Sequence, residues 1–459
     1  MRTLDQILTK KDYSRKTPAS LFYKDSPLWQ KLLAIGCVFF LSVAGLGEWK
    51  VLNGMLGGLP KAITLGVIGL AMLYTLFYPD EKRLREIWKP TLLYMSLMVA
   101  LFFWSMVIWI KSFATVSSMI RSCSKLVFQS IAILTAVALV YLFREKAIEL
   151  FTISICITNG AIMLLCIPDY GVGASIQSLI TCLVTFGDAV GYARQLEIHD
   201  LTFVFGQMIL YYAVFAPRTT RQEKRKRWLY LLACCWFFLV GMKRSAIPAV
   251  LLFILIALLL RKRKVPNWFY PAVGVCYILF FLVFLYCVRY GIISRLLNSV
   301  GVDMMGRDYL WSMANPYYEF SVTYLGHGFE YVDTIIGQWY SAGLINHPYP
   351  FHNDILKVFV EVGFPGFLLW SGIQYVLTPL FWQRYADQET TLLYLCELGY
   401  MTVTYLTDNT AFYFWSTMAL RLVAFSYAME RKKPPEPKVW MPDSRQEMRD
   451  RIRILMKEV

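Results

Sequence analysis

Apolar runs long enough to cross a lipid bilayer recur along this chain, and that feature excludes most folds for it. Inside a bilayer every backbone N–H and C=O must be satisfied within the protein, so such runs predict transmembrane helices. A mean hydropathy of +0.47 agrees with this interpretation. The expected fold is an all-α, polytopic integral membrane protein with about twelve transmembrane helices. We place the spans at roughly 31–48, 60–78, 90–110, 124–143, 148–167, 200–216, 228–242, 245–260, 267–288, 364–383, 390–407 and 411–429. Several runs are near the short limit for a span, which leaves eleven or thirteen open.

Basic residues indicate how these spans are oriented. With the N-terminus in the cytoplasm, most Lys and Arg fall in cytoplasmic loops, which is the usual bias of membrane proteins. The net charge of +15 then reports orientation and attraction to anionic membrane lipid, so no nucleic-acid partner is expected. The cytoplasmic basic runs are Lys82–Arg85, Arg218–Arg227, Arg261–Lys264 and Arg431–Lys433.

The same orientation divides the chain into segments. One outer segment is much larger than the others and is the only one that we expect to build a site. A smaller outer segment holds the amphipathic stretch Ser175–Val184, which predicts a helix on the membrane surface. The segments are 1–30 (cytoplasmic), 31–288 (spans one to nine), 289–363 (the large outer loop), 364–430 (spans ten to twelve) and 431–459 (a cytoplasmic basic tail).

Cysteine usage gives no sign of a cofactor. The ten Cys lie mostly within the expected spans, where a thiol behaves as a small apolar residue. They form no metal-binding or disulfide pattern, and the outer segments contain no Asp-x-Asp pair. We therefore expect no metal ion and no other cofactor, so that side chains would supply any positive charge in a site.

Short polar patterns follow one another toward the outer face. A histidine titrates near neutral pH, and an arginine guanidinium grips phosphate with a planar fork, so the patterns suggest a base beside an anion site. They are Lys243-Arg244 in a tight hairpin between two spans, Gly306-Arg307 with Trp311, Gly326-His327-Gly328-Phe329, and His352-Asn353 with Glu361-Val362-Gly363.

The order of these patterns resembles the O-antigen ligase and polymerase family over about residues 240–370. The resemblance implies a glycosyltransferase in a bacterial plasma membrane whose substrate is a polyprenyl-diphosphate-linked oligosaccharide. It implies an active site on the outer face, contact with membrane lipid, and a flippase and chain-length regulators as partner proteins. In such a reaction an acceptor hydroxyl attacks the anomeric carbon and the lipid diphosphate leaves.

Roles for individual residues follow from the resemblance and from their chemistry. His352 would take the acceptor proton. Arg307, Arg244 and Lys243 would bind the diphosphate and replace a metal ion electrostatically. Residues that would support the site are Asn353, Trp311, Glu361, Gly326 and Gly328.

Each assignment has a structural alternative that the sequence leaves open. His352 or Asn353 would also serve as a cap of the apolar helix that follows. Arg307 would also serve as a solvated loop residue, and Lys243 and Arg244 as cations that snorkel to the interface. Lys243 also departs from the family pattern, which more often has a small polar residue there.

Glu361 is interpreted as a structural residue, and no catalytic role is expected for the other three histidines. Asp354, Lys357 and Glu361 share one helix face, which predicts an ion-paired stripe. His327 occupies the variable position of its motif, and His347 and His199 are expected to be ordinary surface residues.

Three functions remain open. The favoured one is a polymerase that transfers glycan from one lipid diphosphate to a sugar of another lipid-linked repeat unit. A ligase would use the same chemistry on a different acceptor. A flippase or transporter belongs to another class, and it would place its charges along a pathway near the membrane centre.

Two charged residues inside the last spans suggest a structural ion pair. Glu397 and Arg421 lie equally far from the turn Thr407–Thr410, at the same expected depth of roughly 18 Å. A lone charge in a span costs about 2.5–3.5 kcal/mol on insertion scales. We therefore expect Glu397 and Arg421 to pair. The alternative is that Arg421 meets the lipid diphosphate.

Overall fold

The computed structural model describes residues 28–431, except for residues 58, 113–114, 186–188, 302–303 and 305. Every regular element of the described residues is a helix, which confirms the all-α fold. The expectations for residues 1–27 and for the basic tail from residue 432 onward lie outside the described residues.

Each of the twelve apolar runs coincides with a helix or with two or three consecutive helical elements. Six segments are both long and apolar enough to cross a membrane: Leu28–Leu46, Leu59–Phe77, Glu81–Ser112, Val116–Tyr170, Phe269–Arg289 and Asp354–Tyr385. The helical, multi-pass character of the chain therefore holds, while the count of about twelve spans stays a prediction.

The helices follow the chain in order. They are α2 (Leu28–Leu46), α3 (Lys50–Leu56), α4 (Leu59–Ala62), α5 (Leu65–Phe77), α6 (Glu81–Ser112), α7 (Val116–Phe143), η2 (Arg144–Lys146), α8 (Ala147–Tyr170), α9 (Val172–Thr185), α10 (Gly191–Gln195), α11 (His199–Leu210), η3 (Tyr211–Phe215), α12 (Arg221–Val240), α13 (Ala246–Leu260), α14 (Phe269–Arg289), α15 (Ile292–Ser299), α16 (Arg307–Ala314), η4 (Asn315–Tyr317), α17 (Tyr331–Ser341), α18 (Asp354–Ser371), η5 (Gly372–Leu377), α19 (Thr378–Tyr385), α20 (Gln388–Thr407) and α21 (Phe414–Arg431).

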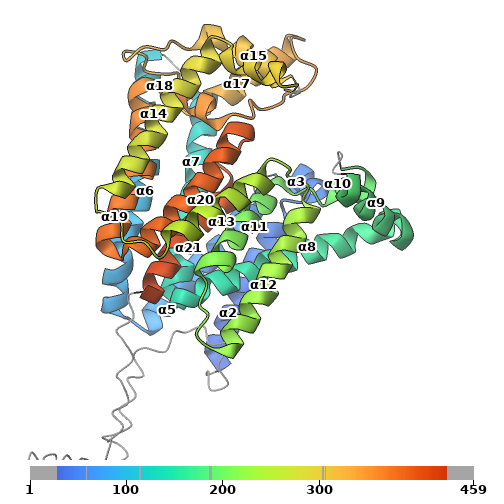
Figure 1. Ribbon diagram of the computed structural model, residues 1–459, viewed down its shortest axis with the longest axis vertical. Coiled ribbons are helices and arrows are strands. Elements are labelled where there is room, and N and C mark those ends of the chain that lie inside the picture. Colours follow the sequence, from blue (N-terminus) through green and yellow to red (C-terminus); the bar gives the residue numbers. More distant parts are fainter. Residues whose placement is uncertain are drawn as a thin grey trace, which may run out of the picture.

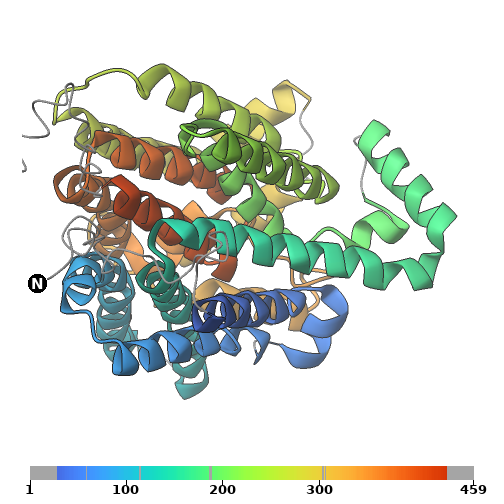
Figure 2. The ribbon, with the colours of Figure 1, turned by 90° about the horizontal axis from the view of Figure 1, so that it is seen from below.

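The bundle has a buried centre and an apolar outside. Helices α11, α20 and α21 are buried along most of their length and form the centre with α7. Helices α13 and α14 are apolar on all sides but expose residues such as Leu255 and Val283. An apolar helix with an exposed apolar face is typical of a helix that contacts lipid. Figure 2 shows α8 and α9 projecting away from the bundle.

The two ends of the bundle differ. Helices α15 and α17 lie across the end at which α18 begins (Figure 1). The turn between α12 and α13 meets the turn between α20 and α21 at this same end. The start of α18 contacts the turn between α20 and α21. The basic runs lie at the opposite end, where Arg261 and Arg431 pair with Glu389.

The segment predicted as the large outer loop is itself largely helical. Residues 289–363 contain three α-helices and the start of α18, which begins at Asp354, before the tenth span expected at 364–383. The helix passes through Gly363, which has φ 63° and ψ −172°, and it is kinked there. Glycine tolerates this backbone because it has no Cβ, and the apolar residues on both sides continue the helix.

The expected ion pair between Glu397 and Arg421 is wrong. Neither carboxylate oxygen of Glu397 has a hydrogen-bond partner among the described residues. The Arg421 guanidinium donates to the carbonyl of Thr417 (3.3 Å) and to the side chain of Gln374 (3.5 Å). Equal distance from a turn fixes depth but not the direction of a side chain, and Arg421 points toward η5.

Candidate functional site

His352 is presented at the start of α18 by a restrained loop. Its φ of 49° lies in the left-handed region, which costs a residue with a side chain about 1–3 kcal/mol. The preceding Phe351 is held on two sides: its carbonyl accepts from Trp311 Nε1 (2.9 Å), and its ring stacks on Trp339. The predicted supporting role of Trp311 thus has a physical basis in the loop that carries His352.

Asn353 is the N-cap of α18, which was the structural alternative for this pair. Its Oδ1 accepts from the backbone N–H of Leu356 at 3.0 Å. Asp354 accepts from the backbone N–H of Ala411 at 2.7 Å, which ties the start of α18 to the turn between α20 and α21. Because His352 immediately precedes these two anchored residues, its side chain is held beside that turn.

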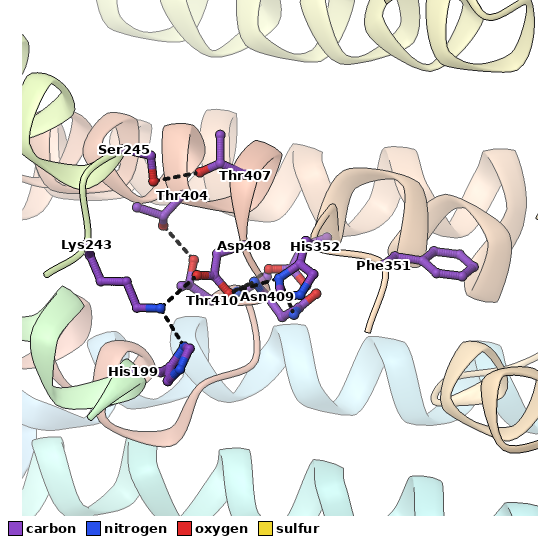
Figure 3. A network of polar contacts seen from close by, with 12 residues as sticks. His199, Lys243, Ser245, Phe351, His352, Thr404, Thr407, Asp408, Asn409 and Thr410 are labelled. Atoms are coloured by element: carbon purple, nitrogen blue, oxygen red, sulfur yellow. Dashed lines mark hydrogen bonds and ion pairs between the residues drawn. The ribbon is translucent and has the colours of Figure 1, made fainter. Parts of the chain in front are cut away.

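The side chain that His352 meets there is Asp408. Nδ1 of His352 lies 3.5 Å from Asp408 Oδ1 and 3.4 Å from Asn409 Nδ2 (Figure 3). Burial alone would raise the pKa of Asp408, but the hydrogen bond with His352 and the positive charge of Lys243 lower that pKa to about 2. The turn therefore places an ionised carboxylate against one ring nitrogen of His352.

Lys243 reaches the same carboxylate from the turn between α12 and α13. Its Nζ lies 2.7 Å from His199 Nδ1, 3.0 Å from Glu197 Oε1 and 3.7 Å from Asp408 Oδ2. Burial and the Lys243 ammonium lower the pKa of His199, against the opposing effect of Asp408 and Glu197. We call His352, Asp408, Lys243 and His199 the histidine cluster.

The two predicted arginines are carried by the turn α12–α13 and by α16. Arg244 is exposed on the same turn as Lys243. Arg307 begins α16 one helical turn before Trp311, and its side chain forms no ion pair among the described residues. The structure thus brings Lys243 and His352 together through Asp408.

The glycine motifs form a second, separate feature. The kink at Gly363 exposes the carbonyl of Glu361, which accepts from the backbone N–H groups of His327 (2.9 Å) and Gly328 (2.7 Å). Gly326 has φ 87°, and a Cβ there would lie 2.4 Å from the Glu361 carbonyl oxygen. A Cβ on Gly328 would lie 2.1 Å from Trp109 Nε1. We call Gly326, Gly328, Glu361 and Gly363 the glycine junction.

Glu361 also holds the outer helices in place through its side chain. Its Oε1 accepts from the backbone N–H of Val332 at 3.2 Å and lies 3.8 Å from Lys357 Nζ. Lys357 pairs further with Asp333 (3.0 Å) and Glu330 (3.4 Å). The expected ion-paired stripe is therefore correct for Lys357 and Glu361, whereas Asp354 bonds elsewhere.

The sequence interpretation missed two members of the cluster. His199 was expected to be an ordinary surface residue, and the structure corrects this by placing it against Lys243. Asp408 was seen only as part of a turn. A signal existed: the sequence predicts Lys243 on the outer side, where cations are disfavoured, and a buried cation needs an acidic partner. The sequence did not indicate which outer turn would supply that partner.

One comparison with known proteins bears on this site. Residues 229–371 match a protein family described as O-antigen ligase. The match covers Lys243, Arg244, Arg307 and His352, but His199 and Asp408 lie outside it. No curated protein matches the sequence significantly.

Proposed function

We propose, on the premise that this chain is a member of the O-antigen ligase and polymerase family, that it is a polysaccharide repeat-unit polymerase. It would transfer glycan from a polyprenyl diphosphate carrier to a sugar hydroxyl of another lipid-linked repeat unit. The flippase and chain-length regulator partners belong to this proposal, as does the outer face of a bacterial plasma membrane.

The reaction needs one base and one site for an anionic leaving group. The acceptor oxygen forms a bond to the anomeric carbon while the bond from that carbon to the diphosphate oxygen breaks, and the electron pair leaves with the diphosphate. The acceptor proton goes to Nε2 of His352. The guanidinium groups of Arg244 and Arg307 stabilise the negative charge that develops on the diphosphate.

The observation that carries this proposal is the way His352 is held. Both close polar contacts of its ring, to Asp408 and Asn409, are made by Nδ1. This leaves Nε2 to face an acceptor, and the side chain keeps about a quarter of its surface exposed. A helix cap alone needs no such arrangement, because Asn353 already caps α18.

A transfer assay with purified protein and lipid-linked repeat unit tests the proposal. His352→Ala should lower turnover by about 10²–10⁴-fold at equal protein yield, because it removes the general base. The matched control is His347→Ala, in the same outer segment, whose exposed ring stacks only on Tyr349 and should leave turnover unchanged. Normal turnover in His352→Ala would remove this residue from the mechanism. Complete loss of activity in EDTA would contradict the metal-independent reaction.

The orientation of the site can be measured separately. Ser321 lies in the outer segment, and Glu223 lies in the basic run at the start of α12. A Cys at Ser321 should react with a membrane-impermeant reagent in intact cells, and a Cys at Glu223 should not. Protection of position 321 together with labelling of position 223 would reverse the orientation.

A ligase with the same chemistry is the alternative, and the difference lies in the acceptor. Cells without a polymerase should accumulate carriers with a single repeat unit. Cells without a ligase should instead accumulate long polymer that has not reached its final acceptor. Glycan analysis of a deletion strain therefore decides between the two.

A further inference from the structure

We infer that Lys243 is a positioning residue, which acts on His352 through Asp408 and is not a ligand of the lipid diphosphate. The inference rests on the proposed function, in which His352 is the base. It reassigns Lys243 from the group of predicted phosphate-binding cations to the histidine cluster.

The first argument is that acceptors of the protein already occupy the surroundings of Lys243 Nζ, two of them as hydrogen-bond partners and the third as an ion-pair partner. An ammonium group has three N–H donors and no acceptor. Three acceptors of the protein surround Nζ: His199 Nδ1 at 2.7 Å, Glu197 Oε1 at 3.0 Å and Asp408 Oδ2 at 3.7 Å (Figure 3). The side chain is only 12% exposed. Two carboxylates next to one ammonium also make the surroundings of Nζ unfavourable for a diphosphate.

The second argument concerns His199, which is held neutral. Because an ammonium only donates, His199 accepts through Nδ1 and carries its proton on Nε2, which lies 3.6 Å from Glu197. Burial and then the charge of Lys243 lower the pKa of His199. Lys243 thus occupies the accepting ring nitrogen of His199, whereas the Nε2 of His352 faces the acceptor in the proposed reaction.

The third argument is that Asp408 connects the two residues. One carboxylate oxygen faces His352 and the other faces Lys243, and the residue is only 7% exposed. The carboxylate stabilises the imidazolium that forms when His352 takes the acceptor proton. Lys243 offsets part of that negative charge and fixes the carboxylate in place, so it sets how strongly His352 holds the proton.

The backbone supports this assignment. Met242, directly before Lys243, has a φ of 53°, and His352 has a φ of 49°. Residues with side chains rarely adopt this conformation, and it persists where the surrounding structure enforces it. His352 itself has this left-handed backbone conformation, and Lys243 directly follows a residue that has it.

The pH dependence of turnover is the main test. The charged and titratable groups around His352 are Asp408 from the turn α20–α21, Lys243 and Arg244 from the turn α12–α13, Glu197 and His199 from the start of α11, and Asp354 from α18. In Lys243→Met the negative charge of Asp408 acts on His352 without an opposing cation. The acid limb of the kcat–pH profile should then move to higher pH by about 0.5–1 unit, with the KM for lipid-linked donor unchanged.

A second variant shows whether the effect passes through Asp408. In an Asp408→Asn background, adding Lys243→Met should produce no further shift of the acid limb, because the carboxylate that links them is gone. The double variant also removes the two charges together, so it should recover yield if Lys243→Met folds poorly. The matched control is Lys111→Met, an exposed lysine in the last turn of α6, which should change neither the profile nor KM.

If Lys243 instead bound the diphosphate, the Lys243→Met variant would behave differently. Lys243→Met would then raise the KM for donor about tenfold, which is the effect of about 1.4 kcal/mol of lost binding, and the acid limb would stay in place. That result would overturn the inference. Full loss of turnover in His352→Ala together with an unmoved profile in Lys243→Met would also overturn it, while leaving the proposed function intact. Normal turnover in His352→Ala would instead overturn the proposed function.

Discussion

The glycine junction lies at the kink of α18 and the histidine cluster lies at the start of the same helix, but the two are built from different interactions. The junction consists mainly of backbone hydrogen bonds between Gly326–Gly328 and the carbonyl of Glu361, in a region without space for a Cβ. The cluster consists of four side chains, three from inter-helix segments and His199 from the start of α11, and the side chains of His199 and His352 remain partly exposed. One of these features thus fixes the course of the backbone, and the other brings titratable side chains together.

The contrast has a physical cause. Two backbones that approach closely need glycine there and leave no space for a Cβ atom, so the junction is rigid. A proton-exchanging group needs access to substrate and a nearby counter-charge, so the cluster keeps His352 partly open and Asp408 buried. Substitutions in the junction should therefore change stability, and substitutions near the cluster should change kinetic constants.

The largest effect is expected at the junction. Gly326→Ala would place a Cβ against backbone atoms at a φ of 87°, and it should lower the free energy of unfolding by roughly 3–5 kcal/mol. The control is Gly343→Ala, which has a φ of 71° but open space around it and should cost only about 1–2 kcal/mol. Thermal unfolding in detergent, followed by size-exclusion chromatography, measures both. Equal losses in the two variants would show that the close packing is unimportant.

A smaller effect is expected beside the cluster, on binding of the donor. Arg307→Lys keeps the charge but removes the planar fork, so the KM for lipid-linked donor should rise about tenfold with the unfolding temperature unchanged. Arg295→Lys is the control, because Arg295 is exposed on the neighbouring helix α15. If the two variants have the same KM, Arg307 only meets solvent at the start of α16 and does not bind the donor.

The smallest effect on turnover is expected at Trp311, which restrains the loop that carries His352. Trp311→Phe keeps the ring packing but removes the hydrogen bond to the Phe351 carbonyl, which contributes about 1 kcal/mol. We expect a several-fold lower kcat with a nearly unchanged melting temperature, since the bond restrains the backbone next to His352. Trp268→Phe, at an exposed position before α14, should change neither quantity. A lower melting temperature with an unchanged kcat would show that Trp311 stabilises the fold, as the glycine junction does, and does not act on His352.

The sequence by itself determined the helical membrane architecture and the order of the site motifs. Apolar runs of bilayer length leave only helices for their backbone, and each run coincides with a helix. The sequence also indicated His352 as a candidate base and Glu361 as a structural residue, because motif spacing and helix periodicity are local properties.

Only the tertiary structure decided which inter-helix turns meet. Asp408 reaches His352 and Lys243 because the turn α20–α21 packs against the start of α18 and the turn α12–α13. The failed pair of Glu397 and Arg421 shows the same limit, since rise per residue gave a common depth but not a common direction. Side-chain direction depends on how each helix is rotated within the bundle, and that rotation results from packing among segments far apart in the chain.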